Sequence, residues 1–251
     1  MNNSQRFNYL LRLGDNALIL GQRLSEWCGH GPILEQDIAI TNIALDLMGQ
    51  ARSWLTLAGE VEGAGRDEDA LAFLRDNRDY RNLLLVEHPN EDFAYTITRQ
   101  FLFDSFNYYL HEALTQSTDE RIVAIAQKSL KEVTYHLRYS SEWMIRLGDG
   151  TEESHAKMQR AVDDLWHYAE EPLLPDAVDA TAAAAGVGPD LAALRPLVEA
   201  KRRAILAEAT LTIPENVYPQ QGGKQGTHTE ALGYLLAEMQ WMQRAYPGAE
   251  W

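Results

Sequence analysis

The sequence is short of cysteine and of basic residues, and each shortage excludes a class of protein. A single cysteine, Cys28, cannot form an intramolecular disulfide, so we expect a chain of the reducing cytoplasm rather than a disulfide-stabilised secreted domain. Lysine and arginine number 22 against 37 aspartate and glutamate residues, which gives a net charge of −15. The phosphates of nucleic acid and of anionic membranes repel such a charge, so neither is expected as a partner.

Long apolar runs are also missing. No stretch of eighteen apolar residues occurs, and the first thirty residues lack a basic start followed by an apolar core. We therefore expect no membrane-spanning helix and no signal peptide. A hydrophobic content of 45% in 251 residues is ordinary for a globular protein and sufficient for a large core.

Apolar residues at helical spacing fill almost the whole chain, which predicts an all-α bundle of long helices with additional helices. No repeat, linker or low-complexity tract divides the sequence, so one domain over residues 1–251 is expected. Tyr80–Pro89 would lack pairing partners as a strand and is expected to be a packed connector or a short helix. The predicted helices are Phe7–Trp27, Ile33–Gly59, Glu68–Asp76, Glu91–Leu114, Glu120–Leu147, Glu152–Ala169, Asp176–Ala185, Pro189–Leu211 and Thr229–Tyr246.

The predicted helix Ile33–Gly59 carries two apolar stripes, and a helix that is apolar on two sides is expected to be buried between neighbours. The first stripe consists of Leu34, Ile38, Leu45, Met48 and Leu55. The second stripe consists of Ile40, Ala44, Leu47, Ala51, Trp54 and Ala58.

The helix Glu120–Leu147 carries the pattern with the clearest chemical meaning. Glu132 and His136 lie one turn apart in a long amphipathic helix, which suggests a carboxylate-bridged di-iron bundle. Such a bundle needs a Glu from each of two helices and a Glu-x-x-His pair from each of the other two. Here Tyr135 occupies the third position after Glu132, and the histidine comes at the fourth.

The second helix that should supply a Glu-x-x-His pair offers Asp46 with Gly49 at the third position. No histidine lies between Gly31 and Glu87, so one imidazole is missing. The sequence therefore predicts no metal site and no catalytic residue. The degenerate ligand positions are Asp46, Gly49, Glu132, Tyr135 and His136.

Two interpretations of Glu132, Tyr135 and His136 remain open. Glu132, Tyr135 and His136 are expected to form an internal hydrogen-bond network, because buried polar groups must be paired. The other hypothesis is a metal-binding oxygenase that uses Glu132 and His136. The true Glu-x-x-His spacing at Glu152–His155 opens a helix after a glycine loop, where acids are expected at the surface.

Helix starts are the remaining candidates for binding. The backbone amides at the start of the second helix and near Asp179–Thr181 are unpaired by helix geometry and could receive an anionic or carbonyl group. Gln221–Lys224 lacks the strand and helix of a phosphate loop and is expected to be a flexible connector.

Six segments together resemble a known family. They are Leu11–Leu20, Gln22–Pro32, Asn42–Arg52, Asn82–Asn90, Tyr135–Ser140 and Gly222–Arg244. The sequence is similar, over nearly its whole length, to the PaaC-type subunits of bacterial phenylacetyl-CoA epoxidase. This multicomponent oxygenase (ring 1,2-phenylacetyl-CoA oxygenase) acts in aerobic phenylacetate degradation. None of the six segments is a catalytic motif.

The resemblance implies a ferritin-like fold and a non-catalytic structural subunit without a cofactor of its own. Its implied partners are a homologous catalytic subunit with a di-iron centre, a small accessory subunit, and a reductase that carries FAD and an iron–sulfur cluster and uses NADPH. The complex would convert phenylacetyl-CoA and O2 to the ring-1,2-epoxide. A stand-alone acyl-CoA-binding module is the third possibility.

The resemblance also implies that phenylacetyl-CoA is bound by the complex. The residues of this chain expected to meet its coenzyme A side lie at the two helix starts. They are Glu35, Gln36, Asp37, Ile38, Asp179, Ala180 and Thr181.

Overall fold

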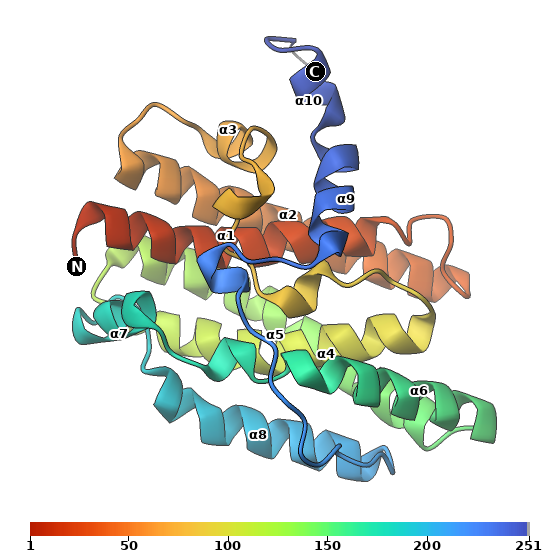
Figure 1. Ribbon diagram of the computed structural model, residues 1–251. Coiled ribbons are helices and arrows are strands. Elements are labelled where there is room, and N and C mark those ends of the chain that lie inside the picture. Colours follow the sequence, from red (N-terminus) through yellow and green to blue (C-terminus); the bar gives the residue numbers. More distant parts are fainter. Residues whose placement is uncertain (250–251) are drawn as a thin grey trace. The chain divides into compact units, whose positions relative to one another are not determined.

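The structure is a computed structural model that describes residues 1–249, and no strand occurs in that range (Figure 1). The predicted all-α, ferritin-like class of long helices with additional helices is confirmed. The α-helices are α1 (Asn3–Ser25), α2 (Leu34–Glu62), α3 (Glu68–Phe73), α4 (Phe93–Leu114), α5 (Glu120–Gly148), α6 (Glu152–Leu165), α7 (Ala177–Ala184), α8 (Leu191–Glu208), α9 (Glu230–Met239) and α10 (Trp241–Ala245). Short 3-10 helices are η1 (Asn77–Asp79), η2 (Leu84–Glu87), η3 (Trp166–Tyr168), η4 (Glu171–Leu173) and η5 (Gly223–Gln225).

The chain divides into two compact units. Unit 1 combines Met1–Pro89 with Gln221–Trp251, of which residues 250 and 251 lie outside the described part, and unit 2 is Asn90–Gln220. The single domain expected over residues 1–251 stays a prediction.

Unit 1 is built on α1 and α2, which pack closely along each other. A Cβ atom at Gly14 of α1 would lie 2.7 Å from Leu55 Cδ2, and one at Gly21 would lie 3.0 Å from Met48 Cε. The two glycines therefore let the helices approach more closely than larger residues would permit. The helix α1 begins with a capping box between Asn2 and Gln5, which pairs backbone groups at its start.

The two apolar stripes of α2 differ in solvent exposure. The second predicted stripe is buried throughout. In the first stripe, Leu55 is buried, but Leu34 is 71% exposed, Ile38 53% and Leu45 64%. The prediction that α2 is buried on both sides is wrong for the first half of the helix, because no part of the described chain covers that face.

Unit 2 is built on α4 and α5, with α6, α7 and α8 around them. The apolar spacing predicted for α5 is confirmed, because Ile122, Val133 and Met144 are fully buried. Asp119 caps α5 by accepting a hydrogen bond from the Arg121 amide. None of the helices formed by residues 1–249 is long and apolar enough to cross a membrane.

Candidate functional site

A polar cluster lies inside unit 2, and we call Gln100, Asp104, His111, His136 and Ser140 the Asp104 cluster. All five side chains are buried, and Asp104 and His136 are fully buried. Gln100 Nε2 donates to Asp104 Oδ1 over 2.8 Å, and Ser140 Oγ lies 2.8 Å from Asp104 Oδ2. Two neutral donors therefore hold the two oxygens of the carboxyl group.

Burial controls the protonation of this cluster. Loss of water raises the pKa of Asp104 to about 6, against the opposing effects of His136, Ser140 and Gln100. Burial also lowers the pKa of His111 to about 4, and the nearby His136 acts in the same direction. The Nδ1 atom of His111 lies 2.9 Å from the carbonyl oxygen of Asn107. A neutral His111 that donates this proton fits the position.

The three residues expected to form one internal network on α5 differ in burial, although the rings of Tyr135 and His136 touch edge to face with their centroids 6.3 Å apart. His136 is fully buried in the Asp104 cluster and lies close enough to Asp104 to oppose the rise in the pKa of that carboxyl group. Tyr135 is 37% exposed, and the Arg138 guanidinium lies 5.6 Å from its ring centre. Glu132 is half-buried. The prediction of a shared internal network is wrong for Tyr135, because consecutive helical residues point about 100° apart.

The side chains that could serve as metal ligands do not fit a di-iron centre. Asp104 is held by an amide and a hydroxyl, and His111 is matched to a backbone carbonyl. The helix α2 contributes half-buried Asp46 and exposed Gly49 and contains no histidine at any position. Within residues 1–249, no group of three or more His, Cys, Asp or Glu side chains is placed to hold a metal ion.

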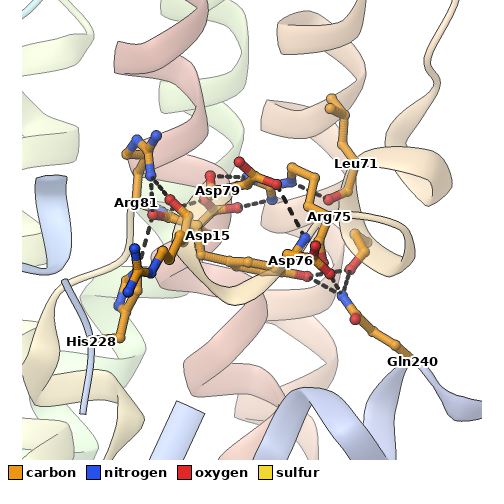
Figure 2. Close-up of polar contacts among 11 residues, drawn as sticks. Asp15, Leu71, Arg75, Asp76, Asp79, Arg81, His228 and Gln240 are labelled. Carbon is orange, nitrogen blue, oxygen red and sulfur yellow. Dashed lines mark hydrogen bonds and ion pairs between the residues drawn. The ribbon is translucent and has the colours of Figure 1, made fainter. Parts of the chain in front are cut away.

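Unit 1 contains a buried ion pair that the sequence did not single out. Asp15 of α1 is fully buried, and the Arg75 guanidinium donates to both of its carboxylate oxygens (Figure 2). The Arg81 amide also donates to Asp15 Oδ2 over 2.8 Å. Arg75 further donates to the carbonyl oxygens of Leu71 and Asp79. The pair thus ties the loop after α3 to the middle of α1.

A second buried pair joins Glu87 to His228, and both side chains are almost inaccessible to water. Glu87 accepts from Asn82 Nδ2 over 2.9 Å and from the Thr229 amide over 2.8 Å. The two ring nitrogens of His228 face Glu87 Oε1 and the carbonyl oxygen of Tyr80. The pair therefore joins the segment before α9 to the loop that precedes α4.

The segment Gly222–Gly226 is held against the Arg78–Leu84 loop rather than left free. A Cβ atom on Gly223 would lie 2.1 Å from the Asn82 carbonyl oxygen, and one on Gly226 would lie 2.4 Å from that of Arg78. Lys224 is buried. The expectation of a flexible connector is therefore wrong, because the glycines permit close backbone packing.

Three residues of these contacts lie in the segments that carry the family resemblance. Asp15 lies in Leu11–Leu20, Glu87 in Asn82–Asn90, and His228 in Gly222–Arg244. The structure brings these distant segments together in one polar interior of unit 1. A single acidic residue inside a mostly apolar stretch, as at Asp15 and Glu87, was the available sequence signal.

The residues expected near coenzyme A lie at the starts of α2 and α7, in different units. In α2, Glu35 and Ile38 are exposed, Gln36 and Asp37 are half-buried, and Asp37 Oδ2 accepts from the Gly31 amide over 2.9 Å. The N-cap residue of α2, Ile33, forms no side-chain cap.

The start of α7 is already capped. Asp176 Oδ1 accepts from the amides of Val178 and Asp179, and Asp179 Oδ2 accepts from the Asp176 amide in return. Ala180 is exposed, and Thr181 donates its hydroxyl proton to the Ala177 carbonyl oxygen. The first turn of α2 therefore offers more open backbone donors than the first turn of α7.

Comparison with known proteins places these features in a family. The sequence matches the family described as phenylacetic acid catabolic protein over residues 1–251. A curated relative from Escherichia coli (strain K12), named as one of the subunits of 1,2-phenylacetyl-CoA epoxidase, is 50% identical over 243 residues. The match covers 97% of this chain and 98% of the relative. The chain belongs to the phenylacetic acid catabolic protein family.

Proposed function

We propose, from membership in this family, that the chain is a non-catalytic structural subunit of a multicomponent phenylacetyl-CoA epoxidase. The observation that carries the proposal is 50% identity along nearly the full length of a relative that is named as a component of that enzyme. The geometry supports it, because Asp104 is held by Gln100 and Ser140, and His111 faces the carbonyl oxygen of Asn107, all in the buried interior of unit 2.

The reaction assigned to the complex uses phenylacetyl-CoA, O2 and NADPH and yields ring-1,2-epoxyphenylacetyl-CoA in aerobic phenylacetate catabolism. Its di-iron centre belongs to a homologous catalytic subunit, and FAD and an iron–sulfur cluster belong to a cytoplasmic reductase. The proposed complex also includes a small accessory subunit. This chain contributes a rigid helical surface that keeps the catalytic subunit in its working conformation.

For the coenzyme A side of the substrate we propose Glu35–Ile38 first and Asp179–Thr181 second. The uncapped start of α2 supports this order, since the amides at the start of α7 already have carboxylate acceptors. The carboxylates of Glu35 and Asp37 would repel phosphate, so the proposed contact is to the amide and hydroxyl groups of the pantetheine arm.

Reconstitution tests the proposal. The catalytic subunit, the reductase and the accessory subunit are assayed for epoxide formation with and without this chain. We expect turnover only when the chain is present, and none from the chain with the reductase alone. Turnover of the catalytic subunit at full rate without this chain would overturn the proposal.

The Glu132→Gln variant separates the proposal from the alternative of an oxygenase that uses Glu132 and His136. Glu132 is half-buried. Glutamine has nearly the same size as glutamate, so the substitution removes the charge with little change in packing. A structural subunit predicts unchanged turnover in the reconstituted complex. A metal ligand predicts loss of turnover, since removal of a carboxylate ligand weakens metal binding.

A further inference from the structure

A cavity of about 800 Å³ lies within unit 1, between η1 and the last two helices, α9 and α10. Its lining comes from two segments that are far apart in sequence, residues 76–79 and residues 233–245. Binding sites for small molecules in proteins have volumes of about 300–1,000 Å³, so the cavity is large enough for a ligand. Neither Glu35–Ile38 nor Asp179–Thr181 contributes to its lining, so it is separate from the proposed coenzyme A contacts.

One wall of the cavity is a face of α9 that carries small residues. Gly233 and Ala237 both line the cavity, and a Cβ atom added to Gly233 would have nothing within 4 Å. Gln240 holds this helix in place, because its Nε2 donates to the Arg75 carbonyl oxygen over 3.0 Å (Figure 2) and to Tyr80 Oη over 2.9 Å. The open space therefore lies beside a helix that is fixed by buried hydrogen bonds.

One of the four charged side chains that line the cavity is available to a ligand. Arg244 Nη2 lies 3.1 Å from Asp76 Oδ1 and donates to the Arg75 carbonyl oxygen over 2.9 Å. Asp79 Oδ2 accepts from the Asp76 amide over 3.2 Å. Within residues 1–249, the exposed guanidinium of Arg78 takes part in no hydrogen bond or ion pair. A guanidinium of this kind can bind a carboxylate through two parallel hydrogen bonds.

Trp241 supplies an aromatic surface in the same cavity. Its side chain is 60% exposed although it lines a cavity. Tyr246 meets the indole edge to face with the ring centroids 6.1 Å apart, which restrains the indole. An exposed indole beside a cavity gains from contact with a second aromatic ring, because both rings then lose apolar surface to water.

We propose that this cavity binds a small aromatic molecule with a single carboxylate, whose ring packs against Trp241 and whose carboxylate pairs with Arg78. Asp76 and Asp79 disfavour a ligand with several negative charges, such as a nucleotide, because like charges repel. The bound molecule joins η1 to α9 and stabilises unit 1. This inference goes beyond the proposed function and does not depend on it.

Titration calorimetry on the full-length chain tests the site with two probes, phenylacetate and indole-3-acetate. We expect at least one of them to bind with a Kd below about 1 mM, which is reasonable for a ligand of this size. Phenylacetamide and indole-3-acetamide have the same rings without the charge. Each amide should bind at least about tenfold more weakly than its acid, because it cannot form the charge-assisted pair with Arg78.

Two variants test the assigned contacts. Arg78→Gln and Trp241→Ala should each raise the Kd of the acid by about tenfold. The matched controls are Arg52→Gln and Tyr234→Ala, at exposed residues of unit 1 that do not line the cavity. Both controls should leave Kd unchanged within about twofold. Circular dichroism checks that each variant keeps its helices.

Gly233→Leu fills the cavity without disturbing a packed neighbour, since the added side chain enters open space. We expect it to abolish binding while the melting temperature stays the same or rises, because leucine favours a helix more than glycine does. Binding that survives Gly233→Leu, or equal affinity for an acid and its amide, would overturn the inference. So would the absence of saturable binding of both acids up to about 10 mM.

Discussion

The Asp104 cluster shows how two buried titratable residues can hide each other's response to pH. Burial raises the pKa of Asp104 from 3.8 to about 6 and lowers that of His111 from 6.5 to about 4. Between pH 4 and 6, folding therefore adds a proton at Asp104 and releases one at His111. The stability contributed by Asp104 falls as the pH rises through this range, and that contributed by His111 increases, so the two effects cancel.

Asp104→Asn should expose the His111 effect. Asparagine keeps the shape and can still accept from Gln100, but it does not titrate. We expect its unfolding free energy to fall by about 2 kcal/mol more than that of the wild type when the pH is lowered from 6.5 to 4. Urea unfolding at a series of pH values measures the difference.

His111→Gln is the matched variant and should show the opposite sign. It retains only the Asp104 effect, so it should lose stability relative to the wild type as the pH rises from 4 to 6. Parallel curves for the wild type and both variants would contradict the proton assignment.

The Asp15–Arg75 pair gives a second prediction at the scale of single residues. Asp15→Asn leaves the Arg75 guanidinium buried without its counter-charge, which should cost about 3–5 kcal/mol in the free energy of unfolding. Asp15→Asn combined with Arg75→Met should cost less than the sum of the single changes. A suitable control is Glu153→Gln in the exposed pair with Lys157, which should produce no measurable change. Chemical denaturation checks all four variants.

At the scale of elements, the sequence predicted the long helices well because their cores and caps are local signals. The apolar spacing of α5 and the cap at Asp119 both lie within a few residues of the feature they define. Elements set by distant contacts were predicted less well. Thr229–Tyr246 was expected to be one helix, but it is divided at Gln240, whose amide reaches the carbonyl oxygens of Ala72 and Arg75.

The turn at η5 offers a prediction for an element held by close packing. Gly223→Ala places a Cβ atom 2.1 Å from the Asn82 carbonyl oxygen, so the backbone must move and the segment should detach from its loop. We expect a lower melting temperature and faster amide exchange in Arg81–Glu87.

Gly233→Ala supplies the control for the η5 variant. Gly233 lies in α9 with nothing within 4 Å of the added Cβ, so alanine should leave stability unchanged or raise it by up to about 1 kcal/mol. Equal melting temperatures for the two alanine variants would contradict the packing role of η5.

At the scale of the whole molecule, the sequence predicted the all-α class, and the absence of a metal site stays a prediction. Both follow from residue types: apolar spacing gives the class, and the prediction about metal rests on the lack of histidine in α2. The polar interior of unit 1 could not be predicted, because Asp15, Glu87 and His228 are far apart in sequence and meet only through tertiary packing. The exposure of Leu34, Ile38 and Leu45 in α2 was missed for a related reason, since apolar spacing alone does not show which side of a helix is covered by other parts of the chain.

The central claim is that this chain supports a metal-containing subunit without binding the metal itself. Iron analysis after anaerobic loading with ferrous ion, on the isolated chain and on the assembled complex, tests it most directly. We predict no stoichiometric iron in the isolated chain and, in the complex, about two irons for each catalytic subunit. About two irons in each isolated chain, lost in Glu132→Gln, would contradict the account.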